Sequence, residues 1–361
     1  MTWATTVYAA GTEGYHTFRI PAVVATPDGT LLAFAEGRRT GPGDAGAIDL
    51  VLRRSTDHGR TWSALQVVSS DPGNTEPGNT VGNPCPLVDP VSGDVVLLTT
   101  RAAGDATESR ILRGEVPAVD SRRVWLQRST DGGVRWTPPA DITASTKRDD
   151  WRWYATGPGH GIALRHGPEA GRLVVPANHS TGPTGHGGHL LLSDDGGRSW
   201  RIGAEDRCPP ERHGAGGPCV HANESTVAEL PDGRIYANTR NQGGRSPAHR
   251  ADAMSSDRGE SFDLAYAPAP ALATPVVQCS VLAAGGRLVF AGPGEQDTRR
   301  RLTVRASPDA GRRWTEEVVV WPGPAAYSDL VDLGDGTLGL LFENGDDGPY
   351  ERISFTPHVL R

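Results

Sequence analysis

A short motif, Ser-x-Asp-x-Gly-x-x-Trp/Phe, recurs five times along the chain and constrains its fold more than any other feature. The copies occupy residues 55–62, 129–136, 193–200, 255–262 and 307–314. Successive copies start between 52 and 74 residues apart, which is the length of a four-stranded unit with one variable connection. The spacing therefore predicts repeated small sheets, as in the blades of a β-propeller.

Each copy of the motif has the residues of a tight turn. The Asp side chain can bind backbone amides, the Gly can adopt a positive φ, and the aromatic residue can pack against a neighbour. Each copy also follows a β-rich run, such as AIDLVLRR at residues 47–54. We therefore expect the motif to connect the third and fourth strands of a blade. A second set of turns, expected between strands one and two, precedes the copies at residues 27–29, 90–93, 168–171, 231–233 and 284–286.

A sixth hairpin is predicted around Gly334-Asp335-Gly336, but no copy of the motif follows it. The last blade thus lacks a fourth strand, which the N-terminal segment TWATTVY can supply. This closure would pair the two ends of the chain and leave no exposed sheet edge. We predict an all-β fold, a six-bladed β-propeller of four-stranded antiparallel blades that forms a single domain over residues 1–361.

The composition excludes some kinds of partner. A net charge of −7 argues against nonspecific binding to nucleic acid, which needs an excess of Lys and Arg. No stretch approaches the roughly 18 apolar residues of a membrane helix, and the N-terminus lacks the basic and apolar regions of a signal peptide. Localisation stays open between the cytoplasm and secretion with the leader missing from this sequence. We expect a monomer.

The four cysteines, at positions 85, 208, 219 and 279, show no zinc-like spacing. We accordingly expect neither a metal nor a cofactor. Cys208 and Cys219 flank a loop rich in Pro and Gly, so a disulfide between them is left open.

The two sets of turns should lie at one end of the propeller, and functional side chains at the other. Pairing around Asp28-Gly29 predicts Arg19 opposite Arg38. Like charges across a sheet destabilise it unless an anion neutralises them, which indicates an anion site. The same reasoning places Glu224 within one residue of Arg240. It also places Tyr327 opposite Asn344 and beside Glu343.

Charged and phenolic side chains from four blades should thus converge on one mouth: Arg19, Arg38, Asp44, Glu224, Arg240, Arg299 to Arg301, Tyr327 and Glu343. Several arginines around a ring suit a substrate carboxylate, since guanidinium is a planar and permanently charged donor. The substrate would then be an acidic sugar or keto acid.

A neutral phenol is a suitable nucleophile for such a substrate, because the substrate carboxylate would repel an anionic one. Tyr327 would need a base, and Glu224 is best placed to accept its proton. Asp44 would serve as general acid, with its pKa raised by burial or by substrate closure. Glu343 would orient Arg19.

Four further motifs, FRIP at 18–21, NES at 223–225, TRN at 239–241 and AYSDL at 326–330, resemble those of bacterial and animal sialidases. Together with the five repeats, the resemblance covers essentially the whole chain. It implies a catalytic propeller that acts as a retaining exo-alpha-sialidase on sialylated glycoconjugates. Sialidases with a Tyr nucleophile are exceptions among glycosidases.

The resemblance also implies roles for individual residues. Arg19, Arg240 and Arg299 form a carboxylate-binding triad, Tyr327 and Glu224 the nucleophile pair, and Asp44 the acid/base. Leu302 selects Arg299 from the arginine run by the pattern R-x-x-L. The segment AEGR at 35–38 implies that Arg38 contacts the sugar near its 4-hydroxyl. Asn83 stands where an Asp is common in the family. The segment WRWYATGPGHGIAL also resembles the family, and its aromatic residues are compatible with either the substrate pocket or blade packing, namely Trp151, Trp153 and Tyr154.

Other functions are compatible with the same sequence. The propeller could transfer sialic acid to an acceptor or within one molecule, or act on a related nonulosonic acid. It could also bind sialic acid without catalysis, or serve a structural role. Intact Asp44, Glu224 and Tyr327 argue against binding without catalysis, and six matched site residues argue against a purely structural role.

Overall fold

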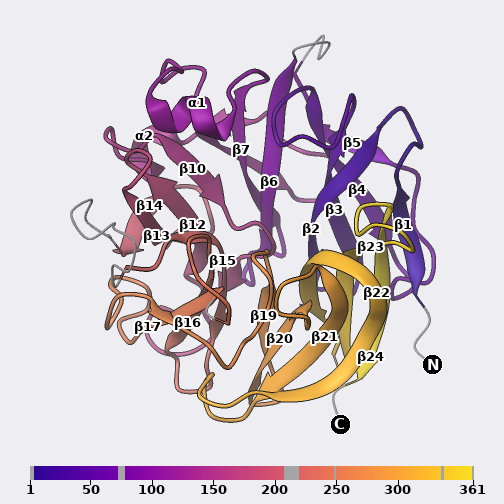
Figure 1. Ribbon diagram of the computed structural model, residues 1–361, viewed down its shortest axis with the longest axis vertical. Helices are drawn as coiled ribbons and strands as arrows, with labels where there is room; N and C mark the ends of the chain where they lie inside the picture. Colours follow the sequence, from indigo (N-terminus) through magenta and orange to yellow (C-terminus); the bar gives the residue numbers. More distant parts are fainter. Residues whose placement is uncertain (1–3, 72–77, 207–218, 248, 335–336, 360–361) are drawn as a thin grey trace.

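The strands radiate around a central axis in six antiparallel blades (Figure 1). The computed structural model describes residues 4–71, 78–206, 219–247, 249–334 and 337–359. The first blade contains β2 (Thr17–Ala25), β3 (Leu31–Arg38), β4 (Ile48–Ser55) and β5 (Gln66–Ser69). The second contains β6 (Asn79–Val88), β7 (Val95–Ala103), β8 (Arg123–Ser129) and β9 (Ala140–Asp141). These two blades share one sheet through the parallel pair Ile48 and Thr80.

The third and fourth blades have the same layout. The third is built from β10 (Trp153–Thr156) with β11 (Ile162–Ala163), then β12 (Leu173–Ser180), β13 (His186–Ser193) and β14 (Arg201–Glu205). The fourth is built from β15 (Ala222–Glu229), β16 (Ile235–Asn241), β17 (Arg250–Ser255) and β18 (Ala267–Pro268). Two short helices, α1 (Glu108–Arg113) and α2 (Thr143–Thr146), lie in connections at the periphery (Figure 1). Within the described ranges, no helix has the length and apolarity to span a membrane.

One long strand joins the fifth blade to the sixth. The fifth blade has β19 (Ser280–Ala284), β20 (Arg287–Pro293) and β21 (Arg300–Ser307), and its outer strand is the first part of β22 (Thr315–Asp332). The second part of β22 is the inner strand of the sixth blade, followed by β23 (Thr337–Asn344) and β24 (Arg352–Val359).

The closure predicted from the sequence is confirmed. The N-terminal strand β1 (Thr5–Ala9) pairs antiparallel with β24, so that Thr5 faces Phe355 and Ala9 faces Arg352. The Tyr8 hydroxyl donates to the Ala33 carbonyl at 2.7 Å, which ties the closing strand to the first blade. The predicted turn residues Asp335 and Gly336 lie outside the described part of the chain.

The repeated motif forms the turn after the third strand of each of the first five blades, as predicted. In the first copy, the Ser55 hydroxyl donates to Asp57 at 2.8 Å and accepts from the Gly59 amide at 2.8 Å. Asp57 also accepts from the Thr61 amide at 2.9 Å. Trp62 packs edge-on against Phe355 of the last blade, with ring centroids 5.5 Å apart. The turn thus joins neighbouring blades as well as neighbouring strands.

Replacement of Gly59 by Ala should destabilise the propeller. Gly59 has φ 81°, and an added Cβ would lie 2.2 Å from the Phe355 ring. We expect a loss of more than about 2 kcal/mol in the free energy of unfolding, because strain and steric overlap combine. Gly132→Ala is the control, since Gly132 has φ 65° but its Cβ would meet no atom within 4 Å. Denaturant unfolding of both variants measures the difference, and equal losses would contradict this account.

The strand registers at the mouth differ from those predicted. Arg19 lies opposite Glu36, and Arg38 lies opposite Thr17, so the predicted pairing of Arg19 with Arg38 is wrong. Two offsets add up. The pairing next to the turn, Ala25 with Leu31, is already one position away from the predicted pairing, and a bulge between Arg19 and Ala22 adds a second position. Similarly, Asn344 lies opposite Ala325 and not opposite Tyr327. Near the turn, Asp332 pairs with Leu338, one position away from the predicted pairing, and a register shift between Ala325 and Ser328 adds a second position.

Such irregularities recur at the mouth end of four inner hairpins, and each contains or adjoins a predicted site residue. They adjoin Arg19 in β2, and contain Asn83 in β6, Glu224 in β15 and Tyr327 in β22. A bulge leaves one residue unpaired and turns its side chain away from the regular alternation. The bulges therefore aim these side chains at the mouth.

Candidate active site

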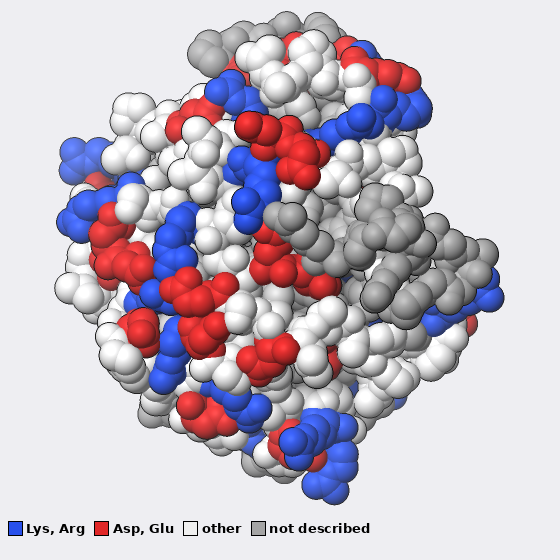
Figure 2. All heavy atoms as spheres, turned by 90° about the vertical axis from the view of Figure 1, so that its left-hand side faces the viewer, with Lys and Arg blue, Asp and Glu red and all other residues white. Residues whose placement is uncertain are grey.

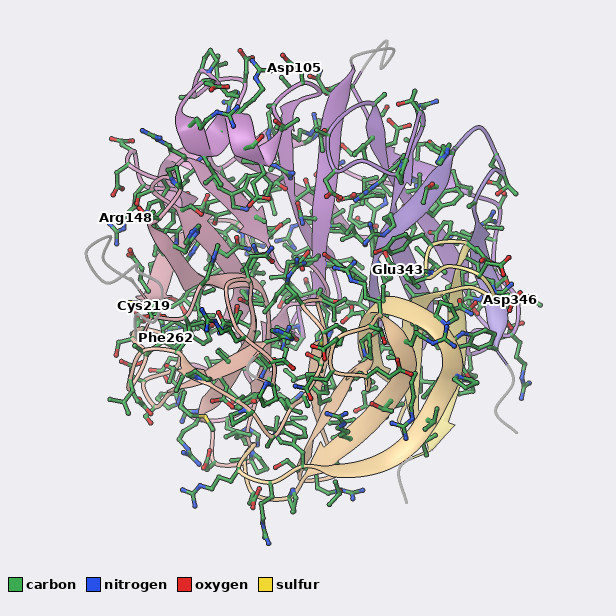
Figure 3. The ribbon with its side chains drawn as sticks, in the orientation of Figure 1. Asp105, Arg148, Cys219, Phe262, Glu343 and Asp346 are labelled. Atoms are coloured by element: carbon green, nitrogen blue, oxygen red, sulfur yellow. The ribbon has the colours of Figure 1, made fainter. Side chains whose placement is uncertain are left out.

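A cavity of about 450 Å³ opens at the mouth of the propeller, at the end opposite the repeated turns. Six of the predicted site residues line it, namely Arg38, Asp44, Asn83, Glu224, Arg240 and Tyr327. Arg19, Arg299 and Glu343 lie next to this cavity through contacts with Tyr327. Glu343 lies near the middle of the ring of blades, whereas Asp105, Arg148 and Asp346 lie at its periphery (Figure 3). The structure thus brings together all nine predicted residues.

Tyr327, Glu224 and Arg240 form a hydrogen-bonded group at the cavity wall. The Tyr327 hydroxyl donates to Glu224 Oε1 at 2.6 Å. Arg240 Nη1 donates to Glu224 Oε2 at 2.8 Å and to the Tyr327 oxygen at 3.1 Å. Burial, together with the Glu224 charge, raises the pKa of Tyr327 above its ordinary value, although Arg240 and Arg19 oppose this shift. The phenol therefore stays protonated until a base accepts its proton, and Glu224 is within hydrogen-bonding distance to do so.

Glu343 accepts hydrogen bonds from both Arg19 and Tyr327, the candidate nucleophile. Its fully buried carboxylate accepts from Arg19 Nε at 2.7 Å and from the Ile20 amide at 2.9 Å. Its other oxygen accepts from the Tyr327 amide at 3.1 Å. The Arg19 guanidinium carbon lies 5.0 Å from the Tyr327 ring centroid. Glu343 thus fixes the relative positions of a cation and a phenol from opposite ends of the chain.

Arg299 is the member of the arginine run that points into the site. Its guanidinium lies 5.8 Å from the Tyr327 ring centroid, and Nη2 donates to the Val276 carbonyl at 2.9 Å. Arg300 is exposed and pairs loosely with Glu295 at 4.0 Å. Sequence reasoning missed Tyr350, whose hydroxyl accepts from Arg299 and whose ring lies 4.0 Å from the Arg19 guanidinium. Tyr350 lies in the connection between β23 and β24, the same type of connection that carries Asp44, and this position could have indicated it.

Asp44 projects into the cavity beside a buried arginine. Arg38, which is 2% exposed, bridges Glu36 at 2.7 Å and Asp44 at 2.8 Å. The Asp44 side chain is 79% exposed. Desolvation alone would raise its pKa, but the charges of Arg38 and Arg19 outweigh this and hold the pKa below its ordinary value. The predicted rise in the Asp44 pKa is therefore wrong for the free protein, because the neighbouring cations favour the carboxylate.

Asn83 faces the cavity from the second blade with a left-handed backbone, φ 51°. Its Oδ1 accepts from Arg122 Nη1 at 2.9 Å and from Thr100 Oγ1 at 3.1 Å. Sequence reasoning also missed Arg122, since it stands in an arginine pair directly before a strand and resembles an ordinary strand-end residue.

Of the three aromatic residues Trp151, Trp153 and Tyr154, two pack between blades and one lies at the cavity. Trp151 and Tyr154 pack in the core between blades, where Trp151 stacks on His179 at 3.6 Å between ring centroids. Trp153 lines the cavity instead.

The remaining predictions concern cysteines, metals and surface charge. Cys219 is disulfide-bonded, while Cys208 lies outside the described residues, so a bond between these two stays a prediction. Cys85 and Cys279 are free and buried. In the part of the chain that the structure describes, no three His, Cys, Asp or Glu side chains gather as a metal site would require. Acidic and basic side chains are interspersed over the face seen in Figure 2.

Comparison with known proteins gives consistent similarities. A family model described as a BNR repeat-like domain matches residues 29–340. The chain is 35% identical over 360 residues to the sialidase of Micromonospora viridifaciens, covering 93% of this chain and 51% of that protein. It is 33% identical over 364 residues to an exo-alpha-sialidase of Aspergillus fumigatus, covering 92% of this chain and 79% of that protein. Thus the chain spans about half the length of the first relative and most of the second.

Solved structures agree with these similarities. The Hadza microbial sialidase Hz136 superposes with a TM-score of 0.83 at 27% identity, covering 99% of this chain and 68% of that chain. An intramolecular trans-sialidase from Ruminococcus gnavus superposes with a TM-score of 0.77 at 19% identity, covering 99% of this chain and 97% of that chain. At 19% identity, the similarity to the Ruminococcus gnavus protein shows a shared fold alone.

Proposed function

Because the chain belongs to the BNR-repeat sialidase family, we propose that it is a retaining exo-alpha-sialidase that removes terminal sialic acid from glycoconjugates. The observation that carries this proposal is the 2.6 Å hydrogen bond between Tyr327 and Glu224, in a cavity surrounded by arginines. A phenol paired with a carboxylate base is the arrangement that an activated neutral nucleophile needs. We propose further that the six blades act together as one catalytic domain.

Substrate binding relies on Arg19, Arg240 and Arg299. These three cations lie beside the Tyr327 ring or hydroxyl, so a carboxylate among them would hold the adjoining anomeric carbon near the phenol oxygen. Arginine suits this role because its fork of donors matches a carboxylate. The triad thereby orients the sugar for attack.

In the first step, the Tyr327 oxygen attacks the anomeric carbon while its proton passes to Glu224. The bond to the leaving sugar breaks, and Asp44 gives its proton to the departing oxygen. In the second step, Asp44 takes a proton from water, which attacks the same carbon. The bond to Tyr327 breaks, and Glu224 returns the proton to the phenolate. Two displacements retain the configuration.

Asp44 must be protonated for the first step, although its pKa is lowered in the free protein by Arg38 and Arg19. The substrate carboxylate would offset part of this positive charge and raise the Asp44 pKa again. For a poor leaving group, kcat/KM should therefore fall as pH rises above the Asp44 pKa of the free enzyme, since the protonated fraction falls.

Replacement of Asp44 by Asn should affect poor leaving groups most. We expect kcat/KM for 3'-sialyllactose to fall by about 10²- to 10⁴-fold, because the departing sugar loses its proton donor. An aryl sialoside, whose leaving group needs little protonation, should lose much less. Asp105→Asn is the control, since Asp105 pairs with Arg110 in the corresponding connection of the second blade. Equal losses on both substrates would contradict the acid role.

Product analysis tests the activity itself. Incubation with 3'-sialyllactose should release free sialic acid and lactose. Added lactose-type acceptors should not turn most of the product into sialylated acceptor. Binding without release would indicate a lectin, and predominant transfer would indicate a trans-sialidase, so either result would refute the proposed hydrolase.

A further inference from the structure

Four buried polar side chains form a cluster on the axis of the propeller, namely His160, Gln278, Ser280 and Asp329. We refer to them as the axial cluster. None of the four lines the cavity at the mouth. His160 instead lines a second cavity, of about 600 Å³, at the end of the axis where the turns between the first two strands lie. The axial cluster therefore separates this second cavity from the candidate active site.

Asp329 accepts hydrogen bonds from three other blades. Its Oδ1 accepts from His160 Nδ1 at 2.7 Å and from Ser280 Oγ at 3.0 Å, and its Oδ2 accepts from the Val23 amide at 2.8 Å. His160 belongs to the third blade and Asp329 to the sixth. These two blades lie opposite each other in a ring of six, so the contact between His160 and Asp329 crosses the axis.

The contact between His160 and Asp329 is a charged one. Burial lowers the pKa of His160, but the charge and the hydrogen bond of Asp329 outweigh burial and raise it. A hydrogen bond between a protonated imidazole and a carboxylate is roughly twice as strong as one between neutral groups. Within the described residues, the other ring nitrogen, Nε2, has no hydrogen-bond partner. The polar contact of the His160 ring thus serves to fix Asp329 in β22.

Tyr327 lies at an irregular point of the same strand. The ladder between β22 and β23 shifts its register between Ala325 and Ser328. A bulged segment lacks the ladder hydrogen bonds of a regular strand, and here the Tyr327 amide donates to the Glu343 side chain instead. The backbone around Tyr327 therefore depends on side chains for its position.

Gln278 holds the residue that directly follows Tyr327. Its Oε1 accepts from the Ser328 amide at 3.1 Å, and its Nε2 donates to the Pro158 carbonyl of the third blade at 3.2 Å. The next residue is Asp329. The two residues after Tyr327 are thus both bound within the axial cluster, one through its amide and the other through its side chain.

We propose that the axial cluster positions Tyr327 for attack on the anomeric carbon, through the backbone of β22. The inference rests on the proposed function and extends it to residues that do not touch the substrate. A displacement of the attacking oxygen by about 1 Å can lower a rate about 10²-fold. Loss of a member of the cluster should therefore slow the attack, whereas binding of sialic acid by the arginines should change little.

Gln278→Met tests this role, because it removes both hydrogen bonds of the side chain at a similar volume. We expect kcat/KM for an aryl sialoside to fall about 10- to 100-fold, while the inhibition constant of free sialic acid changes less than about threefold. In a Tyr327→Phe background the same change should cost less than about threefold in kcat/KM, since no nucleophile is left to position. An equal loss in both backgrounds, in folded proteins, would overturn the proposal.

Gln127→Met is the matched control. Gln127 is also buried and also joins two blades, through the carbonyls of Val68 and Thr137, but it does not line the mouth. It should change kcat/KM by less than about threefold, because loss of a buried neutral hydrogen bond affects stability and not the position of Tyr327. A loss in Gln127→Met as large as that in Gln278→Met would contradict a specific role of the axial cluster.

Two variants of His160 separate a hydrogen-bonding role from simple packing, and they decide the question if Gln278→Met does not fold. Asn places an amide nitrogen where Nδ1 lies, whereas Leu fills the space without a donor. His160→Asn should retain at least about a third of kcat/KM, and His160→Leu should lose at least about tenfold. Equal values, or the reverse order, would overturn the proposal. Wild-type protein that does not cleave the sialoside would instead refute the proposed function, and the positioning role with it.

Discussion

Tyr327→Phe should lower kcat/KM for an aryl sialoside by about 10³-fold or more. The substitution removes only the phenolic oxygen, which is the proposed nucleophile and which hydrogen-bonds Glu224 and Arg240. Loss of a nucleophile is among the largest effects that single substitutions cause in enzymes. Because an aryl leaving group departs readily, the loss must come from attack at the anomeric carbon. Steady-state kinetics over a range of substrate concentration measures it.

A matched control separates this loss from a general effect of removing a buried hydroxyl. Tyr236 lies on β16, the strand that carries Arg240, and its hydroxyl accepts from Asn238 and donates to Asp252 away from the mouth. Tyr236→Phe should change kcat/KM by less than about threefold. Unchanged turnover in a folded Tyr327→Phe protein would exclude the tyrosine mechanism.

Glu224→Gln should lower kcat/KM by about 10²- to 10⁴-fold, since the phenol would lose its general base. The pKa of Tyr327 is raised by burial, so the phenolate does not form unaided at neutral pH. A Gln in this position can still hydrogen-bond the hydroxyl but accepts no proton. Glu229→Gln is the control, because Glu229 lies at the other end of the same strand and accepts from the amides of Arg165 and His166.

A double variant, Tyr327→Phe with Glu224→Gln, shows whether the two residues act together or independently in catalysis. If Glu224 acts only through Tyr327, then Tyr327→Phe with Glu224→Gln should be about as slow as Tyr327→Phe alone, because residues that act as a unit are non-additive. Fully additive losses would instead indicate that Glu224 has a different role.

The repeated motif made the fold predictable. Its Gly adopts a positive φ close to a side chain of a neighbouring strand or blade, as at Gly59 and Phe355, so the sequence carries a clear signal for five of the six blades. The closure by β1 was predictable because the last blade lacks its own fourth strand. The continuity of β22 across two blades was not predicted, since no local pattern distinguishes a long strand from two strands joined by a turn.

The topology was enough to predict which side chains gather at the mouth. It was not enough to predict which residues lie opposite each other on neighbouring strands. Simple register arithmetic failed at Arg19 and Tyr327 because the pairing next to each turn is one position away from the predicted pairing and a bulge farther along adds a second position. Even so, the two offsets together amount to only two positions, and all nine predicted side chains line the cavity or contact Tyr327 at its wall. The lowered pKa of Asp44 and the presence of Arg122 and Tyr350 depend on packing between blades, which no single strand pattern encodes.

The anomer that the enzyme releases first tests the central claim most directly. Proton NMR of a reaction on an alpha-sialoside, recorded before the product mutarotates, identifies it. Two displacements through Tyr327 predict that the alpha anomer of sialic acid appears first and the beta anomer follows slowly. Initial release of the beta anomer would show a single displacement by water and would contradict the proposed mechanism.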